Sequence, residues 1–368
     1  MESEAFVYFG TGEKTFRQNE TDLSHCQSYL ILFIDMGMNF VYATDDRYAG
    51  YCGISLTSLL ENNQDVSDIS VYILAYRISD QNCNKLKALC DMHGVRLLLI
   101  DIENFRDRID FDINTSAYNP IVLSRLFLTS YLPENVDRVL YLDCDIIVTD
   151  SLKALFEDKI GGSDFIEYSV AMCPELYMPD DKKRNIGLDK TDTYFNAGVI
   201  LINLSRWRAL NLDQSFLAYY RAKQGDLLYN DQDIINHCCR RDVLTLPQWY
   251  NTCTNLPYFP KWYLKRIQKA FCYEPSEVYS DRLRKPVIIH YQGEERPWIH
   301  GNRNFYRAFY DQYRQMSEWK SMQMVYGQEK KMRLYHLLNV ITKLFPHFRK
   351  LVTDFIGIRW YQITRNKT

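Results

Sequence analysis

The segment "RVLYLDCDIIV" (residues 138–148) decides the fold of this 368-residue chain. An apolar, β-branched run ends there in two carboxylates, Asp143 and Asp145, which are one residue apart. Charge beside a buried strand is costly unless a partner compensates it. We therefore interpret the whole segment as one buried strand that ends at a charged, functional edge of a sheet.

Strands and helices alternate on the N-terminal side of this segment. Apolar, β-rich runs predict strands, and apolar residues at helical spacing predict the helices between them. The predicted strands are 39–46, 70–76 and 95–102, and the predicted helices are 48–63, 79–94 and 119–133. The helix 79–94 has Ser79 as N-cap and a terminal glycine, and the last helix has Asn119 as N-cap and Pro120 in its first position. This order is typical of an α/β fold with a parallel, doubly wound sheet.

Three further segments follow on the C-terminal side. They are a small-residue turn that enters a buried strand (194–208), an acid-rich helix start (229–239) and a buried strand that ends in His290 (286–298). Ligands of open α/β sheets bind beyond the carboxyl ends of the strands. Asp45 and the 143/145 pair both lie at such ends, and this convergence is the first functional signal.

The bulk composition excludes several classes of protein. A formal net charge of −2 provides no general attraction for nucleic acid. The ten cysteines form no C-x-x-C pair and no zinc spacing, which favours a reducing cytosol. The apolar run "YLILFI" (29–34) is too short to span a bilayer, and we find no signal peptide.

Asp143, Asp145 and His290 are candidate metal ligands. Two aspartates at i and i+2 can meet one divalent cation, and oxygen ligands favour Mg²⁺ or Mn²⁺. An added imidazole favours Mn²⁺. The pattern D-x-D alone is weak, because a solvated strand end or an ion pair gives the same pattern. A histidine at the end of a buried strand is also more often structural than a ligand.

Residues near these ligands suggest a nucleotide. Gly293 allows close approach to a phosphate, and Arg296 forks onto phosphate oxygens. Asp45 can accept hydrogen bonds from a nucleoside, and Tyr48 can stack on a base. A capping role for Asp45 fits the sequence equally well.

These motifs resemble those of the retaining glycosyltransferase family 8, particularly the bacterial lipooligosaccharide galactosyl- and glucosyltransferases. The matching segments are "FVYATDDRYAGYCGISLTSLL", "LSRLFLTSYLPENVDRVLYLDCDIIVTDSL", "YFNAGVILINLSRWR", "DQDIIN" and "HYQGEERPW". They occur in one order over about residues 38–300. The resemblance implies a GT-A fold, which is a Rossmann-like α/β domain with a mostly parallel mixed sheet flanked by helices.

The resemblance also implies a role for each matching residue. The implied metal ligands are Asp143, Asp145 and His290, with Mn²⁺ as the expected ion and Mg²⁺ as the alternative. Ala43, Asp45 and Tyr48 would hold the uridine, Asp143 would also touch the ribose, and Cys144 would offer its backbone. Arg125 and Asn196 would contact the donor sugar, and Gly293 and Arg296 the diphosphate. Asp231 and Gln232 would lie beside the anomeric carbon, although an N-cap pair is the alternative.

Two positions depart from the family pattern. Arg47 stands where close relatives often carry Asn, and Arg296 stands where they usually carry Lys. The expected reaction is retaining transfer of galactose or glucose from a UDP-hexose to a saccharide or glycolipid acceptor, in bacterial surface polysaccharide or lipopolysaccharide synthesis. A metal-dependent nucleotidyltransferase and a non-catalytic carbohydrate-binding protein are the alternatives.

The C-terminal segment differs from the rest of the chain. Residues 329–368 hold nine Lys or Arg and two acids, and Pro346 should divide them into two amphipathic helices. They pack on the catalytic domain or dock on an anionic membrane surface. We expect an N-terminal extension (1–37), a GT-A catalytic domain (38–310) and a helical, basic tail (311–368). The expected location is cytoplasmic and peripheral, on the inner face of the plasma membrane.

Overall fold

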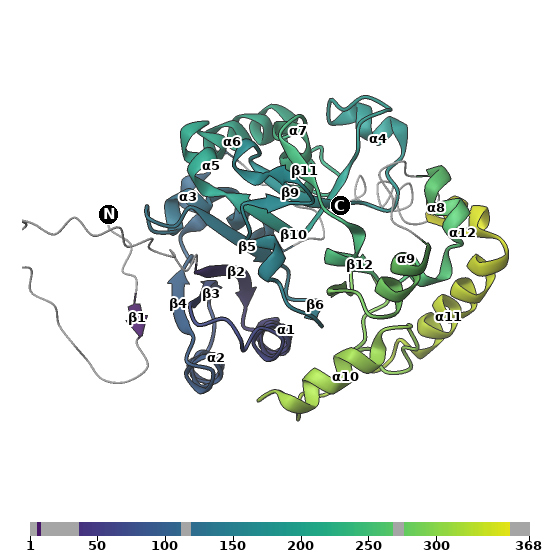
Figure 1. The fold of residues 1–368 in the computed structure, drawn as a ribbon, viewed down its shortest axis with the longest axis horizontal. Helices are drawn as coiled ribbons and strands as arrows, with labels where there is room; N and C mark the ends of the chain where they lie inside the picture. The colour runs from purple at the N-terminus through teal and green to yellow at the C-terminus, as the bar shows by residue number, and fades with distance from the viewer. Residues whose placement is uncertain (1–5, 9–36, 112–118, 268–275, 354–368) are drawn as a thin grey trace, which may run out of the picture.

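The computed structural model of the chain describes residues 6–8, 37–111, 119–267 and 276–353 (Figure 1). Most of the predicted N-terminal extension lies outside these described residues. Two of the ten cysteines, Cys26 and Cys272, and the end of the basic tail after residue 353 also lie outside them. The other eight cysteines are free thiols.

A mixed sheet of eight strands forms the centre of the molecule, in the order β1-β4-β3-β2-β5-β10-β9-β11. The strands are β1 (Phe6–Tyr8), β2 (Met38–Asp45), β3 (Ile69–Tyr76), β4 (Arg96–Asp101), β5 (Arg138–Leu142), β9 (Val170–Pro174), β10 (Phe195–Asn203) and β11 (Val243–Thr245). Strands β4, β3, β2 and β5 are parallel to one another. Strand β10 is antiparallel to both of its neighbours, and β11 is parallel to β9. The predicted α/β class with a mostly parallel mixed sheet is confirmed.

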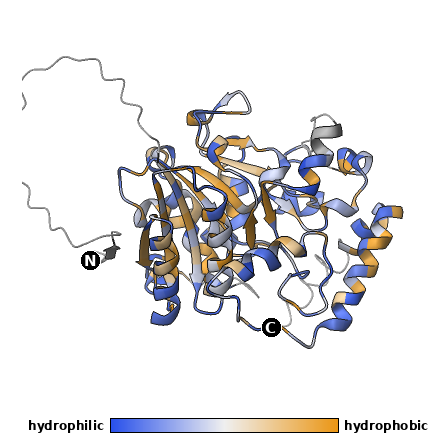
Figure 2. Ribbon diagram, turned by 60° about the horizontal axis from the view of Figure 1, so that its bottom comes forward, coloured by the Kyte–Doolittle hydropathy of each residue, from blue (hydrophilic) through white to orange (hydrophobic). Residues whose placement is uncertain are grey.

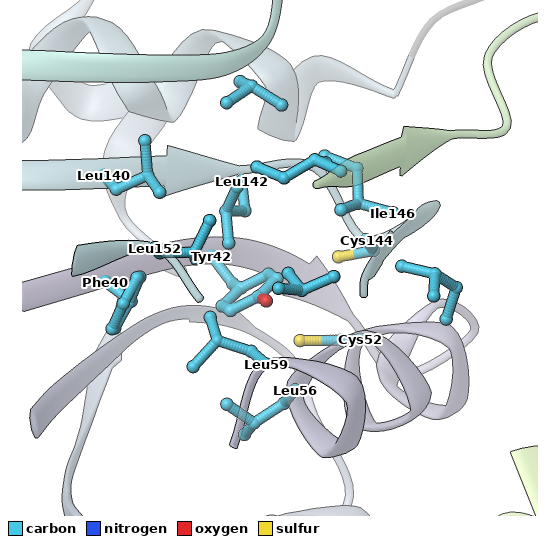
Figure 3. Close-up of a cluster of buried hydrophobic side chains, with 14 of the residues drawn as sticks. Phe40, Tyr42, Cys52, Leu56, Leu59, Leu140, Leu142, Cys144, Ile146 and Leu152 are labelled. Atoms are coloured by element: carbon cyan, nitrogen blue, oxygen red, sulfur yellow. The ribbon is translucent and has the colours of Figure 1, made fainter. Parts of the chain in front are cut away.

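Helices cover both faces of this sheet (Figure 1). On one face lie α1 (Ala49–Glu61), α2 (Asp80–Met92) and α10 (Arg307–Met316), and on the other lie α5 (Leu204–Ala209), α6 (Leu212–Lys223) and α7 (Asp231–Cys238). A hydrophobic core lies on each face of the sheet. Alternate residues of one strand pack into these two cores, because successive side chains of a strand point to opposite faces. Phe40 and Tyr42 pack with α1, as Figure 3 shows, whereas Val41 packs on the opposite face. The strands are accordingly hydrophobic along their length (Figure 2).

The prediction of one strand over 138–148 is wrong. The chain leaves the large sheet after Leu142, and β6 (Ile146–Val148) joins a second sheet in the order β12-β13-β6, with β12 (Thr252–Cys253) and β13 (Ile288–His290). The two acidic residues occupy the turn between the sheets. Antiparallel pairing sets His290 opposite Ile146, directly after Asp145. The break in the strand therefore brings a histidine 145 positions away in the sequence to the aspartates.

Other predicted elements differ in detail. The segment 119–133 is a 3-10 helix, η2 (Pro120–Phe127), followed by the short α3 (Leu128–Tyr131), rather than one α-helix. Asn119 does cap it, because its side chain accepts a hydrogen bond from the Ile121 N–H at 3.2 Å. The small residues of 194–208 lie inside β10 and form no turn. The predicted cap Ser79 is confirmed, and Gly94 has a left-handed φ of +66° after α2.

The described part of the tail from residue 329 onward forms two helices, as predicted. Helix α11 (Glu329–Leu344) ends just before Pro346, at which α12 (Pro346–Val352) begins. The predicted boundary at residue 310 falls inside α10. No helix among the described residues is both long and apolar enough to cross a bilayer. The remaining elements are η1 (Phe105–Arg108), η3 (Lys153–Leu155), β7 (Lys159–Ile160), β8 (Ser163–Asp164), η4 (Phe165–Glu167), α4 (Asp180–Asn185), η5 (Gln248–Tyr250), η6 (Leu256–Tyr258), α8 (Lys261–Ile267) and α9 (Ser276–Arg284).

Trp319 provides a test of this packing. Its ring lies against Gly53 of α1, where an added Cβ would stand 2.0 Å from the ring. An exposed helical Gly→Ala change normally stabilises by about 1 kcal/mol. We expect Gly53→Ala instead to destabilise the protein by about 1–3 kcal/mol, because the indole cannot move aside. Thermal melting measures this. The loss should shrink in a Trp319→Leu background, and a Gly53→Ala variant as stable as the wild type would contradict the packing.

Candidate active site

Every residue that the sequence analysis assigned to the site lines one cavity of about 1400 Å³. The cavity lies beyond the carboxyl ends of β2 and β5, where the two sheets meet. These residues are Ala43, Asp45, Tyr48, Arg125, Asp143, Cys144, Asp145, Asn196, Asp231, Gln232, His290, Gly293 and Arg296. The fold therefore gathers residues that are up to 253 positions apart in the sequence (296 minus 43).

Asp143, Asp145 and His290 form a compact group of ligand atoms. Their candidate ligand atoms all lie within 4.8 Å of one another. The Nε2 atom of His290 is 3.2 Å from Asp145 Oδ1 and 3.8 Å from Asp143 Oδ2. Two carboxylates and one imidazole suit a divalent cation such as Mn²⁺ or Mg²⁺. The donor set thus fits the cation that the sequence predicts.

Hydrogen bonds fix the tautomer of His290. Asn196 Oδ1 accepts from the Gly198 N–H at 2.9 Å, so the group that Asn251 offers to this oxygen, at 2.8 Å, is its NH₂. The oxygen of the Asn251 amide then faces His290 Nδ1 at 2.9 Å. Nδ1 therefore carries the proton and donates it to Asn251. The lone pair on Nε2 is left facing the two aspartates, as a metal-binding histidine requires.

Gly198 makes room for this imidazole. A Cβ at this position would lie 2.2 Å from Cε1 of His290, so only glycine lets the ring lie directly on the backbone of β10. The carbonyl oxygen of the same residue accepts the Asp143 N–H at 2.9 Å. One residue of β10 therefore positions both halves of the ligand group.

The charges of the group compensate one another. Burial would raise the pKa of Asp145, but Arg296 and His290 outweigh it and hold that pKa well below its usual range. Burial would lower the pKa of His290, but Asp145 and Asp143 outweigh it and raise that pKa. The Arg296 guanidinium donates a hydrogen bond to Asp145 and its Nε donates to the Gly293 carbonyl at 2.6 Å. Arg296 is thus held at the edge of the ligand group.

Arg125 is a second, buried cation on the opposite side of Asp143. It donates to Asp143 Oδ1 at 2.7 Å and to the Ala197 carbonyl at 2.6 Å, and its Nε lies 3.2 Å from Asp231 Oδ2. Its guanidinium also lies over the Tyr141 ring, 4.2 Å from the centroid. Burial alone would lower the pKa of Arg125, but Asp143, Tyr141 and Asp231 raise it. Arg125 therefore stays charged and joins two of the acids in the cavity.

Asp231 and Gln232 begin helix α7, and neither of them is its N-cap residue, which is Asn230. The N-cap interpretation of this pair is therefore wrong. Gln232 Oε1 accepts from the Ala197 N–H at 2.9 Å, and its NH₂ donates to the Tyr194 hydroxyl at 3.1 Å. Both ends of the amide are thereby fixed. Burial raises the pKa of Asp231 to about 7, against the opposing effect of Arg125.

Asp45 has both of its carboxylate oxygens engaged. It accepts from the Tyr48 N–H at 3.0 Å, from the Asn119 amide at 2.8 Å and from Arg47 at 3.1 Å. Asp45 thus binds the backbone of Tyr48, which is the N-cap residue of α1, and is not itself that N-cap. Tyr48 is 41% exposed and meets Tyr51 edge to face. Its ring thus offers an open face to the cavity. Cys144 is buried, and its thiol donates to the Ala43 carbonyl at 3.4 Å.

Several residues hold the site together although the sequence motifs did not assign them to it. Asn251 orients His290, and the Asn196 amide donates to Glu175 at 2.7 Å and to Gln292 at 2.6 Å. Asn119, which was assigned only as a cap, also binds Asp45. Tyr194 and Gly198 lie inside the quoted motif "YFNAGVILIN", so their places could have been found. Glu175 directly follows the buried apolar run of β9, a strand-end signal that was available, whereas Asn251 lies in a segment without any pattern.

The raised pKa of Asp231 predicts a measurable effect on stability. A folded-state pKa of about 7, above the ordinary value of 3.8, means that ionisation destabilises the fold as the pH rises from about 4 to 7. Asp231→Asn removes this cost and should stabilise the protein by up to about 4 kcal/mol at pH 8. Thermal melting in EDTA measures the difference. The two proteins should converge near pH 4, and equal stability at pH 8 would contradict the burial of this charge.

Comparisons with known proteins agree with this geometry. Residues 39–301 match the family "Glycosyl transferase family 8". A putative glycosyltransferase of Haemophilus influenzae is 28% identical over 71% of this chain and 73% of its own length. The lipopolysaccharide 1,2-glucosyltransferase of Escherichia coli K12 is 26% identical over 71% of this chain and 72% of its own length. A crystal structure of the galactosyltransferase LgtC with donor and acceptor sugar analogues has a TM-score of 0.62, with 24% identity over 76% of this chain and 96% of that one. The likeness to this crystal structure shows the GT-A fold. The family match covers most of this chain, and it shows that the chain belongs to glycosyltransferase family 8.

Proposed function

We propose that this glycosyltransferase moves a hexose from a UDP-sugar to a saccharide or glycolipid acceptor, with retention, in bacterial lipopolysaccharide or surface polysaccharide synthesis. The observation that carries the proposal is the meeting of Asp143, Asp145 and His290 beside Arg296 in one cavity. The relatives named as a 1,2-glucosyltransferase and as LgtC, a galactosyltransferase, support a hexose. They differ in the sugar, so glucose and galactose are both candidates.

The ligand group would hold Mn²⁺, or Mg²⁺, through Asp143, Asp145 and the Nε2 atom of His290. A bound divalent cation supplies Lewis-acid stabilisation to the departing diphosphate. Arg296 adds a fixed positive charge at the same end of the cavity. Gly293 has a φ of +79°, and no atom lies within 4 Å of the place that a Cβ would take. Its backbone is therefore open to a phosphate.

The nucleoside would lie at the β2 end of the cavity. Ala43 and Asp45 would receive the uracil and ribose, Tyr48 would stack on the base, and Asp143 with the backbone of Cys144 would contact the ribose. Asp45 Oδ1 accepts one hydrogen bond, from the Tyr48 N–H, so its second lone pair can accept from the ligand, whereas Arg47 and Asn119 bind Oδ2. Arg125 and Asn196 would bind the donor sugar.

Gln232 and Asp231 would act at the anomeric carbon. An amide oxygen is a poor nucleophile, so we favour front-face attack over double displacement, with positive charge on the sugar stabilised by Gln232 Oε1. That oxygen accepts one backbone hydrogen bond from Ala197, and an amide oxygen has a second lone pair. Asp231, bound to Arg125, would order a hydroxyl of the sugar or the acceptor.

Loss of a metal ligand tests the proposal. Asp145→Asn and His290→Gln should lower UDP release in the presence of Mn²⁺ by about 10³-fold, because the leaving diphosphate loses its main stabilisation. UDP release is measured with and without a saccharide acceptor, and circular dichroism checks folding. Release of pyrophosphate would identify a nucleotidyltransferase instead, and no turnover by the wild type with any UDP-hexose would favour a binding protein. The anomer of the product, read by NMR, tests retention.

The outer surface of the tail supports a peripheral place at an anionic membrane. Six large apolar side chains are exposed on the described part of it: Leu337, Val340, Leu344, Phe345, Phe348 and Leu351. Lys330 and Arg333 of α11 are exposed as well. Arg349 is buried, so one of the nine basic residues is not available to lipid. We place the protein in the cytoplasm, on the inner face of the plasma membrane, where a glycolipid acceptor would lie.

Liposome flotation tests this surface. Removal of 329–368 should abolish flotation with vesicles that contain anionic lipid. The milder double change Leu337→Glu with Leu344→Glu should lower the affinity for these vesicles by about tenfold or more, because two apolar side chains no longer enter the lipid. Both side chains are more than half exposed, so the fold should survive. The matched control is Met92→Glu, which alters an exposed apolar residue on α2. Unchanged flotation of the 337/344 variant would refute docking through this face.

A further inference from the structure

The inner face of the C-terminal helices is bound to the loop that carries Arg296. Glu295 lies next to Arg296 in that loop and is buried, with 5% of its surface exposed. Its two carboxylate oxygens accept hydrogen bonds from the side-chain NH₂ of Asn339, at 2.8 Å and 3.0 Å. Asn339 belongs to α11 and is fully buried. The Asn339 amide thus binds both carboxylate oxygens of Glu295, which is adjacent to Arg296, the proposed diphosphate-binding residue.

Arg349 of α12 completes the chain of contacts. Its guanidinium donates to the Asn339 oxygen at 2.8 Å and is 7% exposed. The Asn339 amide therefore lies between a buried carboxylate and a buried guanidinium and is hydrogen-bonded to both. A buried charge that loses its partner is strongly destabilising. Helices α11 and α12 and the loop are consequently fixed relative to one another by groups that are costly to separate.

A second contact from α11 reaches the same loop. Lys331 forms an ion pair with Glu294, so two consecutive loop residues are held by one helix. Positions 331, 335 and 339 follow each other at i+4 spacing and share one face of the helix. Tyr335 and Lys331 also line the cavity. The loop is held from its other side by the backbone of Glu295, whose carbonyl accepts from Asn304 at 3.4 Å, and by the Arg296 contact with Asp145.

None of these helical residues falls within the family match, which ends at residue 301. We propose that Glu295, Asn339 and Arg349 are positioning residues, through which the C-terminal helices hold Arg296 in place for the diphosphate of the donor. The proposal rests on the proposed function, because it assigns Arg296 to the donor. It gives α11 and α12 two separate roles: the outer face docks, and the inner face shapes the donor site.

An exchange of charge between two positions tests the proposal. Asn339→Asp sets a second carboxylate against Glu295 and should raise the dissociation constant of UDP, with Mn²⁺ present, by about tenfold, because a hydrogen bond to a charged group is lost. Glu295→Gln alone should have a smaller effect, since its amide oxygen still accepts from Asn339. The double variant Glu295→Gln with Asn339→Asp exchanges the two groups. The new carboxylate at position 339 then accepts from the new amide at position 295 and from Arg349, so this protein should bind UDP as the wild type does. Calorimetry with UDP and Mn²⁺ measures all four proteins.

The matched control and the kinetic readout separate positioning from general damage. Gln323→Glu, which makes the same amide-to-carboxylate change at an exposed position before α11, should leave UDP affinity unchanged. In the Asn339→Asp variant KM for the donor should rise more than kcat falls, because donor binding depends on the loop. An Asn339→Asp variant that folds and binds UDP normally, or a double variant that fails to regain affinity while melting like the wild type, would overturn the positioning role. If the wild type itself does not bind UDP, the proposed function fails instead.

Discussion

The structure depends on a cluster of buried charges at the junction of two sheets. Asp143 and Asp145 could not be withdrawn from water alone, and Arg125 and Arg296 compensate them at contact distance, while Asp231 and His290 contact the same cluster. The residues of the cluster come from η2, from the turn between β5 and β6, from α7 and from β13 with its following loop. Each element must therefore be in place before the charges are compensated, which ties the assembly of the fold to that of the site.

Small and amide residues set the precision of this arrangement. Gly198 lets the imidazole of His290 lie on the backbone of β10, and the chain Gly198–Asn196–Asn251 fixes which nitrogen carries the proton. The Gln232 amide is fixed at both ends in the same way, by Ala197 and Tyr194. Neutral hydrogen-bonding groups thus orient the charged ones, and they do so without adding charge to a cavity that already contains several.

The C-terminal helices extend the same logic beyond the family match. Asn339 binds Glu295 and Arg349 binds Asn339 as buried polar groups, while Lys331 pairs with Glu294 at the surface. A surface helix usually buries its apolar face and exposes its polar one. Helix α11 departs from this pattern, because it buries Asn339 and Thr342 beside Met332 and exposes Leu337, Val340 and Leu344.

The sequence by itself determined the alternation of strands and helices, the Ser79 cap, the break at Pro346 and many of the residues that gather at the cavity, because these follow from local periodicity and from motifs. Only the tertiary structure decided that 138–148 is two strands in two sheets, since apolar character does not reveal which neighbour a strand pairs with. It also decided the partners: Asn251 for His290, and Asn339 and Arg349 for Glu295. Such contacts join residues that are far apart along the chain, and the identity of a single amide or carboxylate carries no signal of what will lie opposite it once the chain folds.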